Sequence, residues 1–403
     1  MKTKQLLVMS ALAATLFTAC EKNLYDPNQN QKEQTVADMV VSPDFDWKMT
    51  EKASCTIQSD HSALLSIYLD EACSESNLLA TVPVRAGSQP VLPLALPTGT
   101  QKVYVQYQNS NNETAVVAAH VQDGKIAFTA PADSKIPALT RAASSSDFEQ
   151  RGTTLYYPAK GEGTVMFEDN YPETGDYDFN DFVGHYQVEI ETLPNSEQIK
   201  TISFTLKVIA IGGIKPYIPH LRIKSFNTTY VESFSVKEHE GDVKVVQMAD
   251  DKGKLVYAFY GAEKNPTKNP NSEFLNTVNG AVTPLTNKVV LTINFKNDPD
   301  INMGYIYVDM FDIFLANSDR SKEIHMSGYG PAFSGNGNYE KENFYKDSDN
   351  LVWGINIPTV IDHAVEKANF LNAYPRFADW ATQNKSVDAW YNTSKPEFLF
   401  QWK

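Results

Sequence analysis

Short segments in which apolar and polar residues alternate run along most of this chain. Between residues 201 and 208 every second residue is apolar, with Ile202, Phe204, Leu206 and Val208 in register. A period of two places such side chains on one face of a β-strand. The same kind of pattern predicts further strands at 55–58, 64–69, 81–84, 91–96, 102–107, 115–121, 125–129, 185–190, 254–260, 289–295 and 305–309. We therefore expect an all-β protein, with a single helix at about 375–383, where Phe377, Trp380 and Ala381 have helical spacing.

Composition divides the strand-rich part of the chain in two. Strands and turn signals alternate every 8–12 residues through 44–131, which is typical of an immunoglobulin-like sandwich. There we expect 55–58 and 64–69 to form a hairpin, and Asp123-Gly124 to mark another. Residues 132–152 are poor in large apolar side chains and indicate a linker. Residues 153–403 then predict a larger β-sandwich or jelly roll carrying the one C-terminal helix.

The charge balance excludes two classes of partner. The chain has 35 basic and 49 acidic residues, a formal net charge of −14. Nucleic acid and anionic lipid headgroups both require a basic face. We therefore expect neither nucleic-acid binding nor electrostatic docking on a membrane.

The first twenty residues have the pattern of an export signal. Lys2 and Lys4 precede an apolar run over 6–14 that is too short to span a membrane. The run leads to Thr18-Ala19-Cys20, which resembles the lipobox of bacterial lipoproteins. That resemblance implies a signal peptide at 1–19, a lipidated Cys20, and an anchor in the outer membrane on either its cell-surface or its periplasmic face. An ordinary cleaved signal beside a chance cysteine is the alternative. Residues 20–43 then form a polar tether.

Two cysteines remain after Cys20. Cys55 and Cys73 lie eighteen residues apart. In an oxidising compartment they could form a disulfide, and two free thiols in a strand-rich domain are the alternative.

The strongest chemical signal is a run of acidic residues without basic neighbours. Residues 161–199 hold ten carboxylates and no Lys or Arg, and six of the ten lie within 168–181. Asp176, Asp178 and Asn180 occupy alternate positions, which directs three oxygen ligands one way while the aromatic residues between them turn towards the core. Oxygen donors in this number suit Ca²⁺. We predict a calcium site whose ligands are Asp169, Asp176, Asp178, Asn180 and Asp181, with Asp169 or Glu168 folding back to complete the shell.

Two other interpretations of this loop stay open. One is a solvated acidic loop that binds nothing, and the other is a catalytic carboxylate pair. An EF-hand does not fit, because Asp181 stands where that loop has glycine and Gln187 stands where it has glutamate.

The acidic run also carries a family resemblance. The segments Phe167-Glu168-Asp169 and 175–183 are similar to the opening signature of the LruC domain of Gram-negative lipoproteins. Later segments resemble the same family, at 204–212, 320–331, 353–358, 373–380 and 390–391. The likeness spans nearly all of 153–403, with departures at Ser321-Lys322 and at 214–218. It implies a β-rich fold and a lipoprotein setting, and it implies no reaction.

Weaker motifs favour structural roles. Asp298 to Gly304 repeats the acidic spacing but favours a hairpin turn. For Asp309 and Asp312 we weigh an ion-facing carboxylate against strand ends, in an apolar strand over 306–315. His325 favours a hydrogen-bonded structural histidine over a catalytic base. Four tryptophans crowd the C-terminal part and favour core packing over a glycan-stacking platform: Trp353, Trp380, Trp390 and Trp402.

These observations favour a non-enzymatic, lipid-anchored envelope protein whose calcium-stabilised β-sandwich binds a glycan or a protein. The alternatives are a glycan hydrolase or lyase that uses the acidic loop, and a subunit of a surface fibre or adhesin joined by strand addition.

Overall fold

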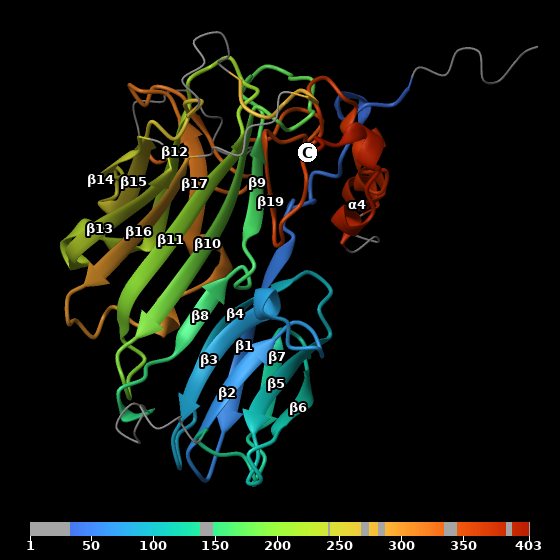
Figure 1. Ribbon diagram of the computed structural model, residues 1–403. Coiled ribbons are helices and arrows are strands. Elements are labelled where there is room, and N and C mark those ends of the chain that lie inside the picture. Colours follow the sequence, from blue (N-terminus) through green and yellow to red (C-terminus); the bar gives the residue numbers. More distant parts are fainter. Residues whose placement is uncertain are drawn as a thin grey trace, which may run out of the picture. The chain divides into compact units, whose positions relative to one another are not determined.

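The fold is that of a computed structural model (Figure 1). It describes residues 33–137, 148–240, 242–266, 274–280, 287–333, 345–383 and 389–402. The signal peptide, Cys20 and most of the tether lie outside the described residues. Thr35–Lys403 forms one compact unit. Among the described residues, no helix combines the length and the apolar character needed to cross a bilayer.

The first seven strands form a sandwich of two sheets, as the sequence predicts. One sheet has the order β4-β1-β7, in which β1 is antiparallel to β4 and parallel to β7. The facing strands follow the order β3-β2-β5-β6 and are all antiparallel. The bounds are β1 Thr50–Gln58, β2 Ala63–Tyr68, β3 Leu78–Val84, β4 Val91–Pro97, β5 Lys102–Gln108, β6 Thr114–His120 and β7 Lys125–Thr129.

Two expected hairpins are wrong in their pairing. β1 and β2 are consecutive but belong to different sheets, so they face one another across the core. Gln122 and Lys125 do close a tight turn, with left-handed Asp123 (φ 50°) and Gly124 (φ 68°) at its centre. The strands on either side of that turn, β6 and β7, again belong to opposite sheets. Turn chemistry indicates where the chain reverses, and burial of both apolar faces decides which sheet the next strand joins.

The larger sandwich shares a sheet with the first. The long sheet runs β13-β16-β11-β10-β8-β3-β2-β5-β6, and β9 joins β10 and β19 beside it. The link is the antiparallel pairing of β3 with β8, at Ala80 opposite Leu155 and Thr81 opposite Thr154. The added bounds are β8 Thr154–Tyr157, β9 Gly163–Phe167, β10 Phe182–Thr192, β11 Ile199–Ala210, β13 Val231–Glu240, β16 Lys288–Phe295 and β19 Gly354–Ile357. The domain limits drawn from the sequence stay predictions.

A second sheet covers the long one in the larger sandwich. Its order is β14-β15-β12-β17-β18, with bounds β12 Ile218–Asn227, β14 Lys244–Ala249, β15 Lys254–Tyr260, β17 Phe311–Ala316 and β18 Glu323–Ile324. The strand expected at 305–309 is wrong. The 3₁₀ turns η4 (Met303–Tyr305) and η5 (Val308–Met310) stand there, and the strand begins only at Phe311.

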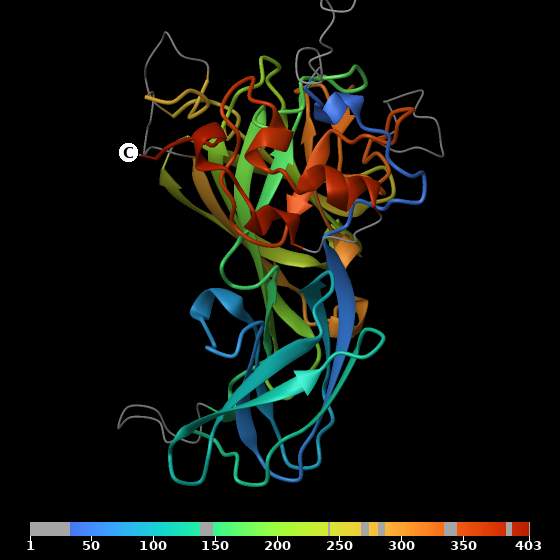
Figure 2. The ribbon, with the colours of Figure 1, turned by 90° about the vertical axis from the view of Figure 1, so that its right-hand side faces the viewer.

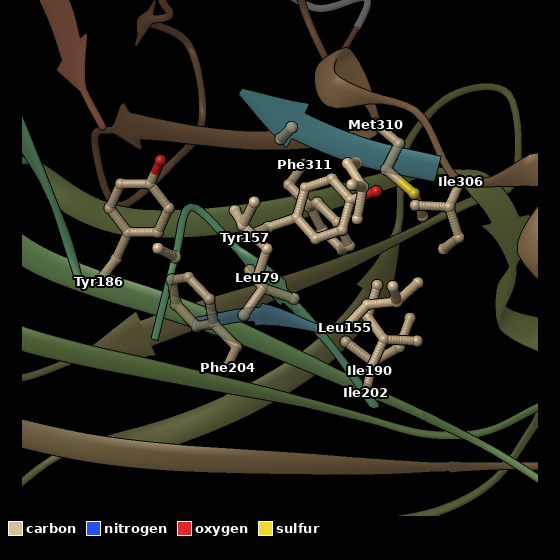
Figure 3. Packing of buried hydrophobic residues seen from close by; sticks show 14 of the residues in the cluster. Leu79, Leu155, Tyr157, Tyr186, Ile190, Ile202, Phe204, Ile306, Met310 and Phe311 are labelled. Atoms are coloured by element: carbon tan, nitrogen blue, oxygen red, sulfur yellow. The ribbon is translucent and has the colours of Figure 1, made fainter. Parts of the chain in front are cut away.

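One hydrophobic core extends through both sandwiches. The apolar face of β11 is buried as the alternation predicts, with Ile202, Phe204 and Leu206 at most 1% exposed. Figure 3 shows side chains from several strands meeting in this core, including Leu79 of β3, Leu155 of β8 and Phe311 of β17. Each such buried side chain contributes about 1.5–3 kcal/mol.

The C-terminal part adds a helical layer beside β9 and β19 (Figures 1 and 2). The helix α4 (Phe377–Thr382) lies within the predicted range of about 375–383, and a further short helix, α3 (Phe370–Ala373), precedes it. Phe377 of α4 packs edge to face against Trp390 of the 3₁₀ turn η6 (Trp390–Asn392), with the ring centroids 4.8 Å apart. Trp353, Trp380 and Trp390 are buried, as core packing predicts, whereas Trp402 is 46% exposed.

Candidate metal centre

The acidic loop, residues 168–181, connects β9 to β10. The two strands are antiparallel neighbours with Phe167 opposite Phe182, so both ends of the loop are fixed side by side. Within it, Tyr177 (φ 54°) and Phe179 (φ 56°) adopt left-handed backbone conformations. Both rings are buried in the cluster that contains α3 and α4. The aromatic residues therefore anchor the loop, and the acidic residues between them turn the other way.

Glu168 holds the loop in this conformation. Its side chain is fully buried, and its two oxygens accept hydrogen bonds from the N–H groups of Tyr177 (3.1 Å) and Phe179 (2.7 Å). A Cβ added at Gly175 would collide with Glu168 Oε2. Left-handed conformations of aromatic residues persist only when their surroundings impose them. Here the Glu168 carboxylate and the aromatic packing do so.

Three carboxylates converge at the centre of the loop. Glu168, Asp176 and Asp178 each offer an oxygen, and the three atoms lie within 4.8 Å of one another. We call these residues the acidic cluster. Asp178 is buried and also accepts hydrogen bonds from the N–H groups of Asn180 (3.2 Å) and Lys367 (2.6 Å). The three residues are placed so that they can hold a metal ion.

Asn180 supplies an independent observation at this site. Its side chain is fully buried, and its Oδ1 finds no hydrogen-bond partner among the residues that the structure describes. A Cβ added at Gly212 would collide with this Oδ1, so the glycine leaves room for it. A buried oxygen without a donor is unfavourable by about 1–3 kcal/mol, and a cation would relieve that.

Burial and crowding shift the pKa values of the carboxyl groups in the loop. Burial, together with the neighbouring Asp181 and Asp178 carboxylates, raises the pKa of Glu168 well above its ordinary value. Burial and then Asp176 raise the pKa of Asp178 to about 8. Burial and then Asp169 raise the pKa of Asp181 to about 7. Lost hydration and mutual repulsion cause all three shifts, and a bound cation opposes both. All donors are oxygens, as Ca²⁺ and Mg²⁺ prefer.

The structure separates the five predicted ligands. Asp176 and Asp178 join the acidic cluster and Asn180 lies beside it. Asp169 turns to the segment after β11, where its Oδ2 accepts from Lys215 N (2.8 Å) and its Oδ1 lies 3.9 Å from Lys215 Nζ. Asp181 Oδ2 accepts from the N–H of Asp169 at 2.7 Å. These two residues hold the base of the loop.

Sequence patterns give little weight to one residue of this site and do not identify another. Glu168 enters the sequence argument only as an alternative to Asp169. Glu366 also lies near the acidic cluster, and burial and then Asp176 raise its pKa. It lies almost two hundred positions along the chain, so no local spacing could have indicated it.

Cys55 and Cys73 are free in the structure. Cys55 is buried in the main core on β1, whereas Cys73 packs beside Tyr68, Leu78 and Tyr156. Of the two alternatives, the structure has the free thiols.

Asp298 to Gly304 forms a turn, but the expected hairpin is wrong, because β16 before it and β17 after it belong to different sheets. The Asp298 side chain accepts from Asp300 N, and the Asn302 side chain accepts from Gly304 N.

Asp309 and Asp312 have cationic partners of their own. Asp309 pairs with Lys48 at 2.6 Å on the surface. Asp312 is fully buried, accepts from Arg222 Nη2 at 2.6 Å, and lies 2.9 Å from His325 Nδ1. Nε2 of His325 is 2.7 Å from Glu323. His325 is therefore the hydrogen-bonded histidine that the sequence favours. We call Arg222, Asp312, Glu323 and His325 the paired cluster.

Comparisons with known proteins add a domain and a fold. Residues 197–391 match the family model described as a domain of unknown function, DUF4842. The acidic loop lies just before this match. The crystal structure of a candidate lipoprotein from Bacteroides ovatus superposes with a TM-score of 0.67 at 20% identity, over 85% of this chain and 100% of that one. No curated protein matches the chain. The similarity establishes a shared fold, and the LruC resemblance stays a prediction.

Proposed function

We propose that this chain is a lipid-anchored envelope protein without enzymatic activity, in which Ca²⁺ stabilises the acidic loop of a β-sandwich that serves binding or adhesion. The observation that carries the metal part is the convergence of Glu168, Asp176 and Asp178 within 4.8 Å, in a loop that also holds the unpartnered Asn180 oxygen. Calcium suits the site better than zinc, because every converging donor is an oxygen.

The role of the ion follows from what the loop contacts. Asp178 accepts the N–H of Lys367, and Asn180 donates to the carbonyl of Ala364 at 3.4 Å. Both partners belong to the segment that leads from β19 into the helical layer. An ion that neutralises the carboxylates would therefore fasten the β9–β10 connection to the C-terminal part.

The geometry gives less support to a glycosidase. Its two carboxyl groups must flank a sugar, with separations of about 5–9 Å across an accessible cleft. Here the converging oxygens are closer than 4.8 Å, and Glu168 and Asp178 are buried. Both carboxylates also accept backbone N–H groups. A structural ion site matches these features better than acid–base catalysis.

The metal proposal is tested by thermal unfolding of the purified chain in Ca²⁺, Mg²⁺ and chelator. We expect Ca²⁺ to raise the melting temperature and Asp178→Asn to remove most of that rise. The matched control is Asp300→Asn, which alters an exposed aspartate in the similarly spaced turn at 298–304. Identical melting of the native protein in calcium and in chelator would contradict the proposal.

The lipid anchor rests on the sequence pattern at Cys20. Metabolic labelling with a radioactive fatty acid should mark the native chain and leave Cys20→Ser unlabelled. Protease treatment of intact cells then distinguishes the cell-surface face of the outer membrane from the periplasmic face. Equal labelling of the two chains would contradict the anchor.

One observation favours the fibre subunit as a second candidate. In the described part of the chain, β6 ends the long sheet. This strand has the sequence Thr-Ala-Val-Val-Ala-Ala-His, and its Val116 and Val117 are each 38% exposed. Edge strands usually carry charges that block pairing with other chains, and β6 carries no Lys, Arg, Asp or Glu. If it adds strands, light scattering should show association that rises with concentration and disappears in Val117→Lys.

A further inference from the structure

One pocket of the molecule shares no lining residue with the acidic loop. Its volume is about 390 Å³, and it is lined by His185 of β10, Lys207 and Ile209 of β11, residues 360–363 after β19, and Trp402. His185 and Lys207 are directly opposite one another in the β10–β11 pair. Their side chains therefore lie on the same face of the sheet.

The rim of the pocket carries exposed apolar surface. Trp402 is 46% exposed and Val360 is 43% exposed. The Trp402 ring is supported edge to face by Phe400, with centroids 4.9 Å apart, and its centroid lies 6.3 Å from that of His363. A tryptophan held in this way offers a flat apolar surface to a ligand.

Two histidines in the lining have ring nitrogens without partners. Nε2 of His363 lies 2.7 Å from the carbonyl oxygen of Asn276, and the ring of His185 interacts with the backbone of Ile361. The other nitrogen of each ring, Nδ1 of His363 and Nε2 of His185, has no hydrogen-bond partner among the described residues. Each ring thus uses one nitrogen on the backbone and keeps the other as a free acceptor.

Both rings are neutral at ordinary pH. Burial lowers the pKa of His363 to about 4. Burial and then Lys207 lower the pKa of His185 to about 4. Their unpartnered nitrogens are therefore acceptors that require a donor, and they are shielded from bulk water. Such an acceptor lacks the hydrogen bond that it makes in water, and a ligand hydroxyl can supply one after a small shift of the ring.

The surrounding charges restrict what this ligand can be. Two neutral acceptors and the Asp362 carboxylate disfavour an anion. Lys207 disfavours a metal cation. Among the described residues, the side chains grouped closely enough to hold a metal ion are those of the acidic cluster. None of them lines this pocket. A neutral molecule with several hydroxyl groups and one apolar face fits these conditions.

We propose that this pocket binds a neutral saccharide, whose apolar face stacks on Trp402 and whose hydroxyl groups donate to His185 Nε2 and His363 Nδ1. Lys207 and Asp362 would contact further hydroxyl groups at the rim. The inference gives the proposed binding role a ligand class. It depends on that role but not on the metal, because the two sites have no side chain in common.

The test is an array of neutral oligosaccharides of glucose, galactose, mannose and N-acetylglucosamine, probed with the labelled full chain. We expect binding to at least one of these classes, and at least tenfold weaker binding by Trp402→Ala. The matched control is Tyr305→Ala, which removes an aromatic residue of similar exposure (52%) outside the pocket. His185→Gln should also weaken binding, which provides a second variant if Trp402→Ala folds poorly.

Intrinsic fluorescence provides a second readout. The other four tryptophans are at most 6% exposed, so a soluble quencher reports mainly on Trp402. The bound oligosaccharide should protect it from quenching. Absence of binding to every sugar, or equal binding by Trp402→Ala and the native chain, would overturn the proposal. So would a Zn²⁺-induced thermal shift that His185→Gln abolishes. The calcium melt is scored separately, so either proposal can fail alone.

Discussion

The acidic cluster and the paired cluster both bury carboxylates, yet they neutralise them differently. In the paired cluster, Asp312 and Glu323 are fully buried but contact Arg222 and His325 directly. In the acidic cluster, Glu168 and Asp178 are buried beside further carboxylates, and the nearby Lys215 pairs with Asp169 instead. A buried charge requires a partner. One cluster is therefore neutralised by side chains of the chain itself, whereas the other has the place where, by our proposal, an ion from solution binds.

The paired cluster also organises its own loop. Glu323 accepts the N–H groups of Ala332 and Phe333, at 2.7 and 3.0 Å. Arg222 donates to the carbonyls of Gly330 and Pro331, at 2.6 and 3.1 Å. In each cluster, carboxylates accept hydrogen bonds from backbone N–H groups and so hold a loop in place. The positive charge beside them is the Arg222 guanidinium in the paired cluster and, by our proposal, Ca²⁺ in the acidic cluster.

The largest expected effect comes from breaking the paired cluster. Arg222→Met leaves the buried Asp312 with His325 as its remaining partner in the paired cluster, and it leaves the two loop carbonyls without their donor. Removing one member of a buried ion pair typically lowers the free energy of unfolding by about 3–5 kcal/mol. Urea denaturation should show such a loss equally in calcium and in chelator. A loss below about 1 kcal/mol would mean that Asp312 does not depend on Arg222.

The next effect comes from removing one charge of the acidic cluster. Glu168→Gln removes a ligand of the proposed ion and replaces one of the two oxygens that accept backbone N–H groups, so we expect the calcium-free protein to lose some stability as well. The stabilisation by calcium, about 2.7 kcal/mol at a hundredfold excess over Kd, should largely disappear. Glu173→Gln, at an exposed acidic residue of the same loop, is the matched control. Full retention of the calcium response by Glu168→Gln would contradict the site.

A smaller effect should follow pH at the paired cluster. Burial opposes the charge on His325, but Asp312 and Glu323 raise its pKa above the ordinary value. Because the folded pKa is the higher one, this stabilisation is fully present below the unfolded value of about 6.5. It is lost as pH rises through the folded pKa, by at most about 1.4 kcal/mol per pH unit. Denaturation between pH 6 and 9 should show this slope in the native chain, and His325→Gln should lack it.

The smallest effect is expected at the exposed ion pair of Lys48 and Asp309. Its two side chains are 42% and 37% exposed, so water already solvates both charges. Exposed pairs contribute about 0–1 kcal/mol. Lys48→Ala should therefore lower the free energy of unfolding by less than 1 kcal/mol in the same denaturation series. A loss comparable with that of Arg222→Met would remove the distinction between buried and exposed pairs.

Local patterns predict the strands well and their partners poorly. The alternation at 201–208 identifies β11 because a period of two is a property of neighbouring residues. The expected strand at 305–309 is wrong because two 3₁₀ turns occupy this segment, and within it Ile306 is buried whereas Tyr305 is 52% exposed. The pairing of β3 with β8 joins segments more than seventy residues apart, and nothing within either segment signals it.

For the candidate metal site, too, the sequence predicts what is local and misses what is distant. The spacing of Asp176, Asp178 and Asn180 locates the loop, since these residues are close in sequence. The sequence also predicts Asp169 and Asp181 as metal ligands. In the structure Asp169 accepts a hydrogen bond from Lys215, and Asp181 accepts one from the backbone N–H of Asp169. Neither partner could be read from the spacing of the acidic residues. Glu366, His185 and His363 are isolated in sequence. The pairing of β19 with β9, and the course of the segment that follows β19, bring them near these sites.

The ladder of hydrogen bonds passes from one sandwich into the other through β3 and β8 without a flexible connection. A body joined in this way has no hinge at that point, so a pull on its first strands is transmitted directly to the strands that carry the acidic loop. By our proposal of a binding role, a force on a bound ligand would therefore be carried by the hydrogen bonds between strands.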